Sequence, residues 1–151
     1  GLPRGLCCLE ASCPCAPERT PGIRECELEA RARGHALYHT TKRSIIRAMV
    51  YRGIALKRRL EAAGTRVIEV YPYASKRVLF ASRMPKKSTP EGLRWLAENV
   101  ARVVISAPSL DDSVSHDELD AIVAAYTGLL FLRGRAIELG APDEGTIVIP
   151  A

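Results

Sequence analysis

The spacing of apolar and polar residues predicts a chain built mainly from helices. Apolar residues recur at helical intervals in several stretches, and Gly34 and Gly64 stand where two of these helices should end. Ser115 and Glu118 match a capping box, in which each side chain bonds to the other residue's backbone N–H at a helix start. The predicted helices span residues 24–33, 41–63, 73–81, 90–100 and 115–140.

Two segments have the character of strands. Residues 66–71 combine β-branched and aromatic side chains and stop at Pro72, and residues 146–149 form a weaker second strand. One strong and one weak strand cannot make a sheet for these helices to cover. The pattern therefore predicts an α/β domain with an incomplete sheet, whose first strands are missing from the N-terminal side of this chain.

Composition is that of one globular domain over residues 1–151. Of the 151 residues, 47% are hydrophobic and 26% are charged, which is enough for a core and argues against disorder. No apolar run has the length that spans a bilayer, so we expect no membrane association. Residues 1–22 read as a loop rich in Cys and Pro. All five cysteines lie in the first 26 residues, and this odd number favours a reducing cytoplasm over a disulfide framework.

Three carboxylates carry the most suggestive chemistry. Glu69 lies in the middle of the predicted strand, on the same face as Val67 and Tyr71. Asp117 and Asp120 are three residues apart, which places them on one helix face with Cβ atoms about 5–6 Å apart. A strand acid that faces two helix acids can hold divalent ions that activate water against a phosphodiester. The alternative is structural, since the helix dipole favours both Asp residues and Glu69 can pair with an arginine.

Several segments, taken in their order and spacing, resemble a known family over nearly the whole chain. They are Gly1–Cys8, Arg24–Glu27, Tyr38–Lys42, Glu69–Pro72, His116–Ala121 and Glu144–Pro150. They resemble the domain-of-unknown-function family numbered 429, which is described as predicted nucleases with a ribonuclease-H-like fold. The resemblance implies that Glu69, Asp117 and Asp120 are catalytic residues and ligands of Mg²⁺ or Mn²⁺.

The same resemblance implies that this chain lacks part of the site. The family has an essential Asp on its first strand and a second Asp just before the turn in which this chain begins. Both acids would lie upstream of Gly1. We therefore expect the chain as given to bind metal poorly and to lose activity, because the bridging acid of a two-metal site is missing.

Basic residues predict a nucleic-acid partner. The net charge is +5, and Arg24, Lys42 and Arg43 lie at the starts of two predicted helices, where they can contact phosphates. Aromatic residues make up only 5% of the chain, so we expect backbone recognition rather than base stacking. The alternative for these basic residues is a solvated helix face. A sheet edge bared by missing strands can also drive homo-oligomerisation.

Four cysteines, Cys7, Cys8, Cys13 and Cys15, suggest a metal site. Four thiolates can close a structural zinc site. Their spacing departs from a pair of C-x-x-C motifs, and Pro14 restricts the backbone between two of them. Zinc ligation and incidental or redox-active thiols are therefore both open interpretations.

These observations predict a metal-dependent nuclease that hydrolyses phosphodiester bonds. The alternative is a non-catalytic nucleic-acid-binding or structural module of the same fold, because a fold does not fix a function. The first hypothesis requires cleavage that depends on the acids and a metal. The second requires salt-sensitive nucleic-acid binding without a metal.

Overall fold

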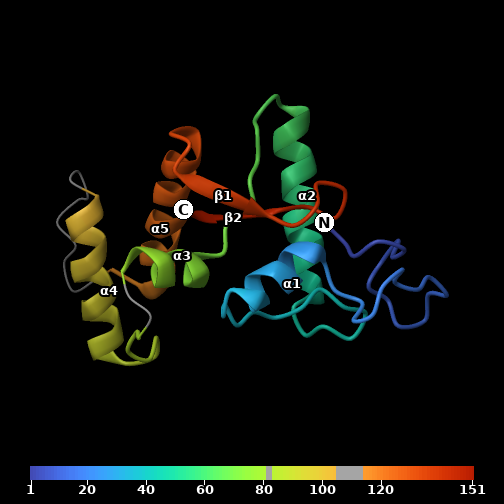
Figure 1. The fold of residues 1–151 in the computed structure, drawn as a ribbon, viewed down its shortest axis with the longest axis horizontal. Helices are drawn as coiled ribbons and strands as arrows, with labels where there is room; N and C mark the ends of the chain where they lie inside the picture. The colour runs from blue at the N-terminus through green and yellow to red at the C-terminus, as the bar shows by residue number, and fades with distance from the viewer. Residues whose placement is uncertain (81–82, 105–113) are drawn as a thin grey trace. The chain divides into compact units, whose positions relative to one another are not determined.

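The structure, a computed structural model, describes residues 1–80, 83–104 and 114–151 (Figure 1). Within these residues the fold is mixed α/β, as predicted, and no helix is both long and apolar enough to cross a membrane. The helices are α1 (Glu25–Ala32), α2 (Arg47–Ala62), α3 (Pro72–Leu79), α4 (Pro90–Val103) and α5 (His116–Leu132). The strands β1 (Ala136–Leu139) and β2 (Ile147–Pro150) pair as a two-stranded sheet.

The chain divides into two compact units. Unit 1 comprises Gly1–Glu69 and Glu138–Ile147, and it contains α1 and α2. Unit 2 comprises Val70–Ile137 and Val148–Ala151, and it contains α3, α4 and α5. Each unit thus joins segments that are far apart in the sequence.

Unit 2 is built on α5, which packs against both α3 and α4 (Figure 1). Its core contains Leu96 and Val100 from α4 and Leu119 and Val123 from α5, and each of these side chains is at most 2% exposed. In each helix the two residues are four positions apart, so they lie on one face. Burial of these apolar faces stabilises the unit.

Local signals fix the starts of α4 and α5 as predicted. Pro90 occupies the first turn of α4, where its missing N–H costs nothing, and Thr89 caps the helix. At α5 the Ser115 side chain accepts a hydrogen bond from the N–H of Glu118. The Glu118 carboxylate in turn accepts one from the N–H of Ser115 at 2.8 Å, so the predicted capping box is confirmed.

The prediction that this last helix continues to Gly140 is wrong. Gly134 has a φ of +67°, a left-handed conformation that glycine adopts without strain. The N–H of Arg135 then returns to the carbonyl oxygen of Leu130, which closes the helix at Leu132 and allows β1 to begin. The apolar residues of β1 follow the helix so closely that the sequence pattern shows no break between them.

The predicted strand over residues 66–71 is also wrong. Among the described residues, this segment forms a single β-bridge, a parallel one between Val70 and Val148, and no ladder. A β-branched run favours extended backbone, but a strand also needs a neighbour for its N–H and C=O groups. The predicted strand at residues 146–149 is confirmed as β2 to within one residue.

The N-terminal segment of unit 1 has no helix or strand before α1, as predicted for residues 1–22. It is nevertheless held against a core, since Leu9, Ile23 and Cys26 are each at most 2% exposed. Gly140 passes so close to α1 that a Cβ there would lie 2.4 Å from the backbone nitrogen of Cys26. With a φ of +86° as well, this position accepts only glycine.

α1 confirms the helix predicted at residues 24–33, whereas α2 starts later than predicted. The start predicted at residue 41 is wrong, because α2 begins at Arg47, and no side chain caps it. None of the residues of α2 is buried, and Met49 and Leu56 are each 55% exposed. Its apolar spacing therefore marks a helix but no buried face.

Leu119 and Leu132 of α5 test the assignment of the core. Leu119 is fully buried and Leu132 is 78% exposed. We expect Leu119→Ala to lower the free energy of unfolding by about 2–5 kcal/mol, because it leaves a cavity. Leu132→Ala on the same helix should change it by less than about 0.5 kcal/mol. Urea denaturation of both variants measures the difference, and equal losses would contradict the assigned core.

Candidate functional site

Arg24 is the centre of a buried ion-pair network in unit 1. Its side chain is 7% exposed. The two Nη atoms donate to the two carboxylate oxygens of Glu69 at 2.7 and 2.8 Å, and Nε donates to Glu27 at 2.9 Å. Desolvation would raise the pKa of Glu69, but the hydrogen bonds and charge of Arg24 hold that pKa below its ordinary value. Glu69 is therefore an ionised partner of Arg24.

Glu27 extends this network to the segment before α2. Its carboxylate is fully buried and accepts hydrogen bonds from both the backbone N–H and the hydroxyl of Thr40. It also accepts the backbone N–H of Arg24, which stands at the start of α1. The network thus connects α1 with the residues before α2 and the residues before α3, all within unit 1.

Two predicted site residues, Arg24 and Glu69, are therefore partners of each other. Glu69 does not lie on a buried strand face as expected, because its side chain is 43% exposed. Its pairing with an arginine is the structural alternative that the sequence left open. Phosphate binding by Arg24 stays a prediction, and a buried guanidinium does not favour it.

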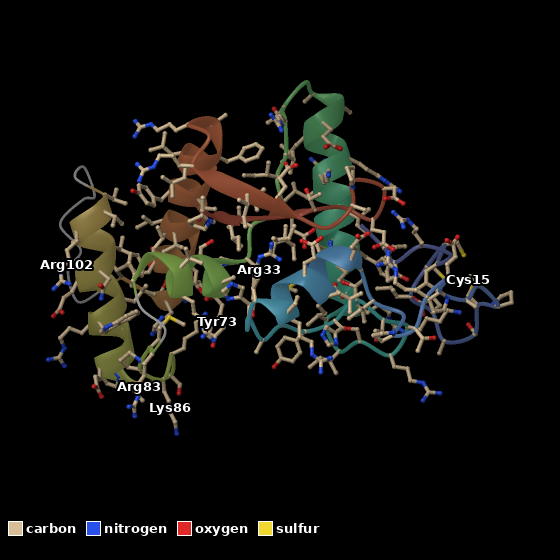
Figure 2. All side chains as sticks on the ribbon, in the orientation of Figure 1. Cys15, Arg33, Tyr73, Arg83, Lys86 and Arg102 are labelled. Carbon is tan, nitrogen blue, oxygen red and sulfur yellow. The ribbon has the colours of Figure 1, made fainter. Side chains whose placement is uncertain are left out.

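A second ionic cluster surrounds the first turn of α5 in unit 2. Lys76 of α3 lies 2.6 Å from Oδ1 of Asp120, and its side chain is only 8% exposed. Lys87, in the segment before α4, lies 3.2 Å from Oδ1 of Asp117 and 3.1 Å from Oδ2 of Asp120. Figure 2 labels the neighbouring Lys86, which precedes the N-terminus of α4. Both predicted helix acids thus approach a single ammonium group.

His116 is the first residue of α5 and lies beside this cluster. Both ring nitrogens are shielded from water, and neither has a hydrogen-bond partner among the described residues. Desolvation lowers the pKa of His116, and the charges of Lys87 and Lys76 lower it further. The imidazole next to the two Asp residues is therefore held in its neutral form near pH 7.

The predicted three-acid metal site stays a prediction. Glu69 belongs to unit 1 and Asp117 and Asp120 belong to unit 2, and each acid has a basic partner within its own unit. Over the described part of the chain, the group of three or more potential ligands whose atoms are close enough to share one metal ion consists of cysteines. The sequence missed Lys76 and Lys87, because one lies inside an apolar helix pattern and the other reads as a basic connector.

Cys7, Cys8, Cys13 and Cys15 form this group in the N-terminal segment. Their Sγ atoms all lie within 4.8 Å of one another, and those of Cys7 and Cys13 are 3.5 Å apart. All are free thiols, and Figure 2 shows Cys15 at the end of the N-terminal loop. Hydrogen bonding to the backbone of Cys8 lowers the pKa of Cys15 to about 6. Hydrogen bonds with Cys13 and Cys15 raise the pKa of Cys7 to about 12.

Lys42 and Arg43, the other predicted nucleic-acid contacts, have different environments. The Lys42 ammonium donates a hydrogen bond to the carbonyl oxygen of Cys13, so it is attached to the cysteine loop. Arg43 is exposed. The predicted contact of either residue with phosphate stays a prediction, and Arg43 is the better placed of the two.

Glu144 is a buried acid whose structural role the sequence did not indicate. It accepts the backbone N–H of Arg4 at 2.8 Å and that of Glu25 at 2.6 Å, and Arg19 lies 2.7 Å away. Its side chain has no exposed surface. Glu144 therefore holds the N-terminal loop and the start of α1 to the segment before β2. The nearest signal in the sequence was its place in a segment of the family resemblance.

The geometry describes a mixed α/β chain with one thiol cluster and one acid–lysine cluster. The family model for a protein of unknown function, DUF429, matches residues 2–145, so the chain belongs to that family. This confirms the family that the sequence segments resemble. Neither a curated protein nor a solved structure matches the chain.

Glu27→Ala tests the buried network. It removes the partner of Thr40 and one partner of Arg24, so we expect a loss of about 3–5 kcal/mol in the free energy of unfolding. The control is Glu61→Ala, which removes an exposed helical pair with Lys57 and should cost less than about 1 kcal/mol. Chemical denaturation measures both, and a loss at Glu27 no larger than that at Glu61 would refute the network's importance.

Glu144 predicts a dependence of stability on pH. Desolvation would raise its pKa, but the N–H groups of Arg4 and Glu25 and the charge of Arg19 hold it below the ordinary 4.5. The stability that ionised Glu144 contributes is therefore complete above pH 4.5. It is lost as the pH falls through the lower pKa that Glu144 has in the folded state.

We expect Glu144→Gln to be less stable than the parent at neutral pH, since an amide has one acceptor oxygen for three donors. The difference should shrink as the pH falls to about 3. Denaturation at a series of pH values measures it, with exposed Glu98→Gln as the control. A difference that grows with acid would contradict the assigned ionisation.

Proposed function

We propose that this chain belongs to a metal-dependent nuclease, a ribonuclease-H-like protein that hydrolyses phosphodiester bonds with Mg²⁺ or Mn²⁺. The observation that carries the proposal is the approach of Asp117 and Asp120 to one cation, the ammonium group of Lys87. Family membership agrees with the proposal without assigning an activity.

The chemistry of this cluster fits a hard divalent ion. Carboxylate oxygens are the ligands that Mg²⁺ prefers, and it needs few of them because it keeps several waters. Asp117 and Asp120 would hold the ion, which would supply charge neutralisation and an activated water. Lys87, freed from the carboxylates, and Lys76 would then be cations beside the phosphate. The neutral ring of His116 offers a nitrogen that can accept a proton.

Glu69 enters the proposal on family likeness alone, because Arg24 holds both of its carboxylate oxygens. The net charge of +5 and the exposed Arg43 support nucleic acid as the partner. Five free cysteines support a reducing compartment such as the cytoplasm.

Binding of Mn²⁺ by this chain, and cleavage of nucleic acid by the chain joined to the first strands that the family has, test this proposal. Electron paramagnetic resonance follows free Mn²⁺ during a titration with the protein. We expect Asp120→Asn to weaken binding at least about tenfold and to reduce cleavage at least about a hundredfold, since it removes a charged ligand. The control is Asp143→Asn, which disrupts a different Asp pair, with Arg4, and should leave both unchanged.

The outcomes separate the two candidate functions. Cleavage that Asp120→Asn leaves unchanged would refute the assigned role of this residue. Binding of nucleic acid that weakens with salt, without cleavage and without a metal requirement, would support the non-catalytic module instead.

A further inference from the structure

Packing does not explain the four clustered cysteines. Cys26 shows what a packed cysteine looks like in this chain, because it is fully buried on α1 and burial raises its pKa to about 12. By contrast Cys7 is exposed, and Cys8, Cys13 and Cys15 are only partly buried. Thiols in this position contribute little apolar burial, so another interaction must account for their convergence.

The distances in the cluster suit tetrahedral coordination. Zinc binds thiolate sulfur at about 2.3 Å, so the sulfurs of a regular tetrahedron lie about 3.8 Å apart. The four Sγ atoms here lie within 4.8 Å of one another, and the pair Cys7 and Cys13 is at 3.5 Å. The unusual spacing of the four cysteines in the sequence therefore does not prevent them from meeting.

We propose that Cys7, Cys8, Cys13 and Cys15 form a structural zinc site that fixes the N-terminal segment of the protein. The site is closed, because four thiolates complete the coordination and leave no position for substrate. It is independent of the acid–lysine cluster, since it uses soft sulfur ligands in place of carboxylates.

The surroundings of the cluster support a fixed loop. The ammonium group of Lys42 donates to the carbonyl oxygen of Cys13, which brings a positive charge to a site that would carry two negative charges when zinc is bound. The backbone N–H of Leu9 donates to the hydroxyl oxygen of Tyr51 at 2.7 Å, and the Leu9 side chain is fully buried. The loop is thus attached to the rest of unit 1 on both sides of residue 10.

A bound metal ion would order this segment, which contains no helix or strand. The backbone before α1 forms turns and coil, so few regular hydrogen bonds order it. One ion bound by four side chains of such a loop would fix its conformation in place of regular backbone hydrogen bonds, as in small metal-stabilised domains.

The test uses the whole chain, purified under reducing conditions and loaded with Zn²⁺ or Co²⁺. Native mass spectrometry should show one zinc ion per chain, and the Co²⁺ form should show the absorption of tetrahedral thiolate coordination. We expect Cys13→Ser and Cys15→Ser to weaken zinc binding at least about a hundredfold, measured by competition with a chromophoric chelator. Cys26→Ser is the matched control and should keep its zinc.

Limited proteolysis separates a structural role from adventitious binding. Zinc should protect the bonds of residues 1–22 from cleavage in the parent, and Cys13→Ser should lose this protection. Zinc below about a tenth of an equivalent in the parent would overturn the proposal. So would equal loss of zinc in Cys26→Ser. Asp120→Asn should keep its zinc, so failure of the nuclease proposal leaves this result intact.

Discussion

The guanidinium of Arg24, withdrawn from water, is the constraint on which unit 1 depends. A buried charge is tolerated only when its donors are used, and here they bind Glu27 and both oxygens of Glu69. Because Glu27 also binds Thr40, three segments that are distant in the sequence must assemble together or leave a charge unpaired. Such a network contributes little net stability compared with an apolar core, but it allows one arrangement of these segments.

The same constraint decides which acids a metal can reach. The Arg24 fork holds Glu69 by two short bonds, and planar bidentate pairs of this kind are the strong ones. Lys87 is a single ammonium group, with its side chain 56% exposed, opposite an Asp117 that is 93% exposed. Exposed pairs of that kind are worth about 0–1 kcal/mol, so a divalent ion can replace the lysine at little cost. Asp117 and the Oδ2 atom of Asp120, which face Lys87, are therefore more accessible to a metal than Glu69, whereas Oδ1 of Asp120 stays paired with the nearly buried Lys76.

Signals within a few residues predicted the helix starts. The Ser115 and Glu118 box and Pro90 act through their own backbone turns, so their positions follow from the sequence. The strand expected at Glu69 failed because a β-ladder needs a neighbouring strand from elsewhere in the chain, and within the described residues the segment forms a single β-bridge, at Val70. The extension of α5 failed because its apolar pattern continues into β1.

The candidate sites divide in the same way. Residue types and spacing identified the cysteines and the Asp pair of α5, since both are local in the sequence. Their partners come from far along the chain: Lys76 lies on α3, and Lys42 reaches Cys13 from the segment before α2. No period or motif indicates such contacts. Only the folded chain could show that two lysines neutralise the acids, or that an ammonium group lies beside the thiols.

The two proposed metal sites differ in ligand chemistry, and that difference allows one chain to hold both. Thiolates are soft ligands that select zinc, whereas carboxylates select hard ions such as Mg²⁺ and Mn²⁺. Zinc held by Cys7, Cys8, Cys13 and Cys15 would therefore not compete with an ion at Asp117 and Asp120. The cysteine site completes its coordination from four side chains of one loop, so it needs no residue of unit 2. The acid site lies in unit 2, and the ammonium group of Lys87 would have to leave the carboxylates before an ion could bind there. Zinc would accordingly act on the fold of unit 1, and the hard ion would act on the chemistry at the start of α5.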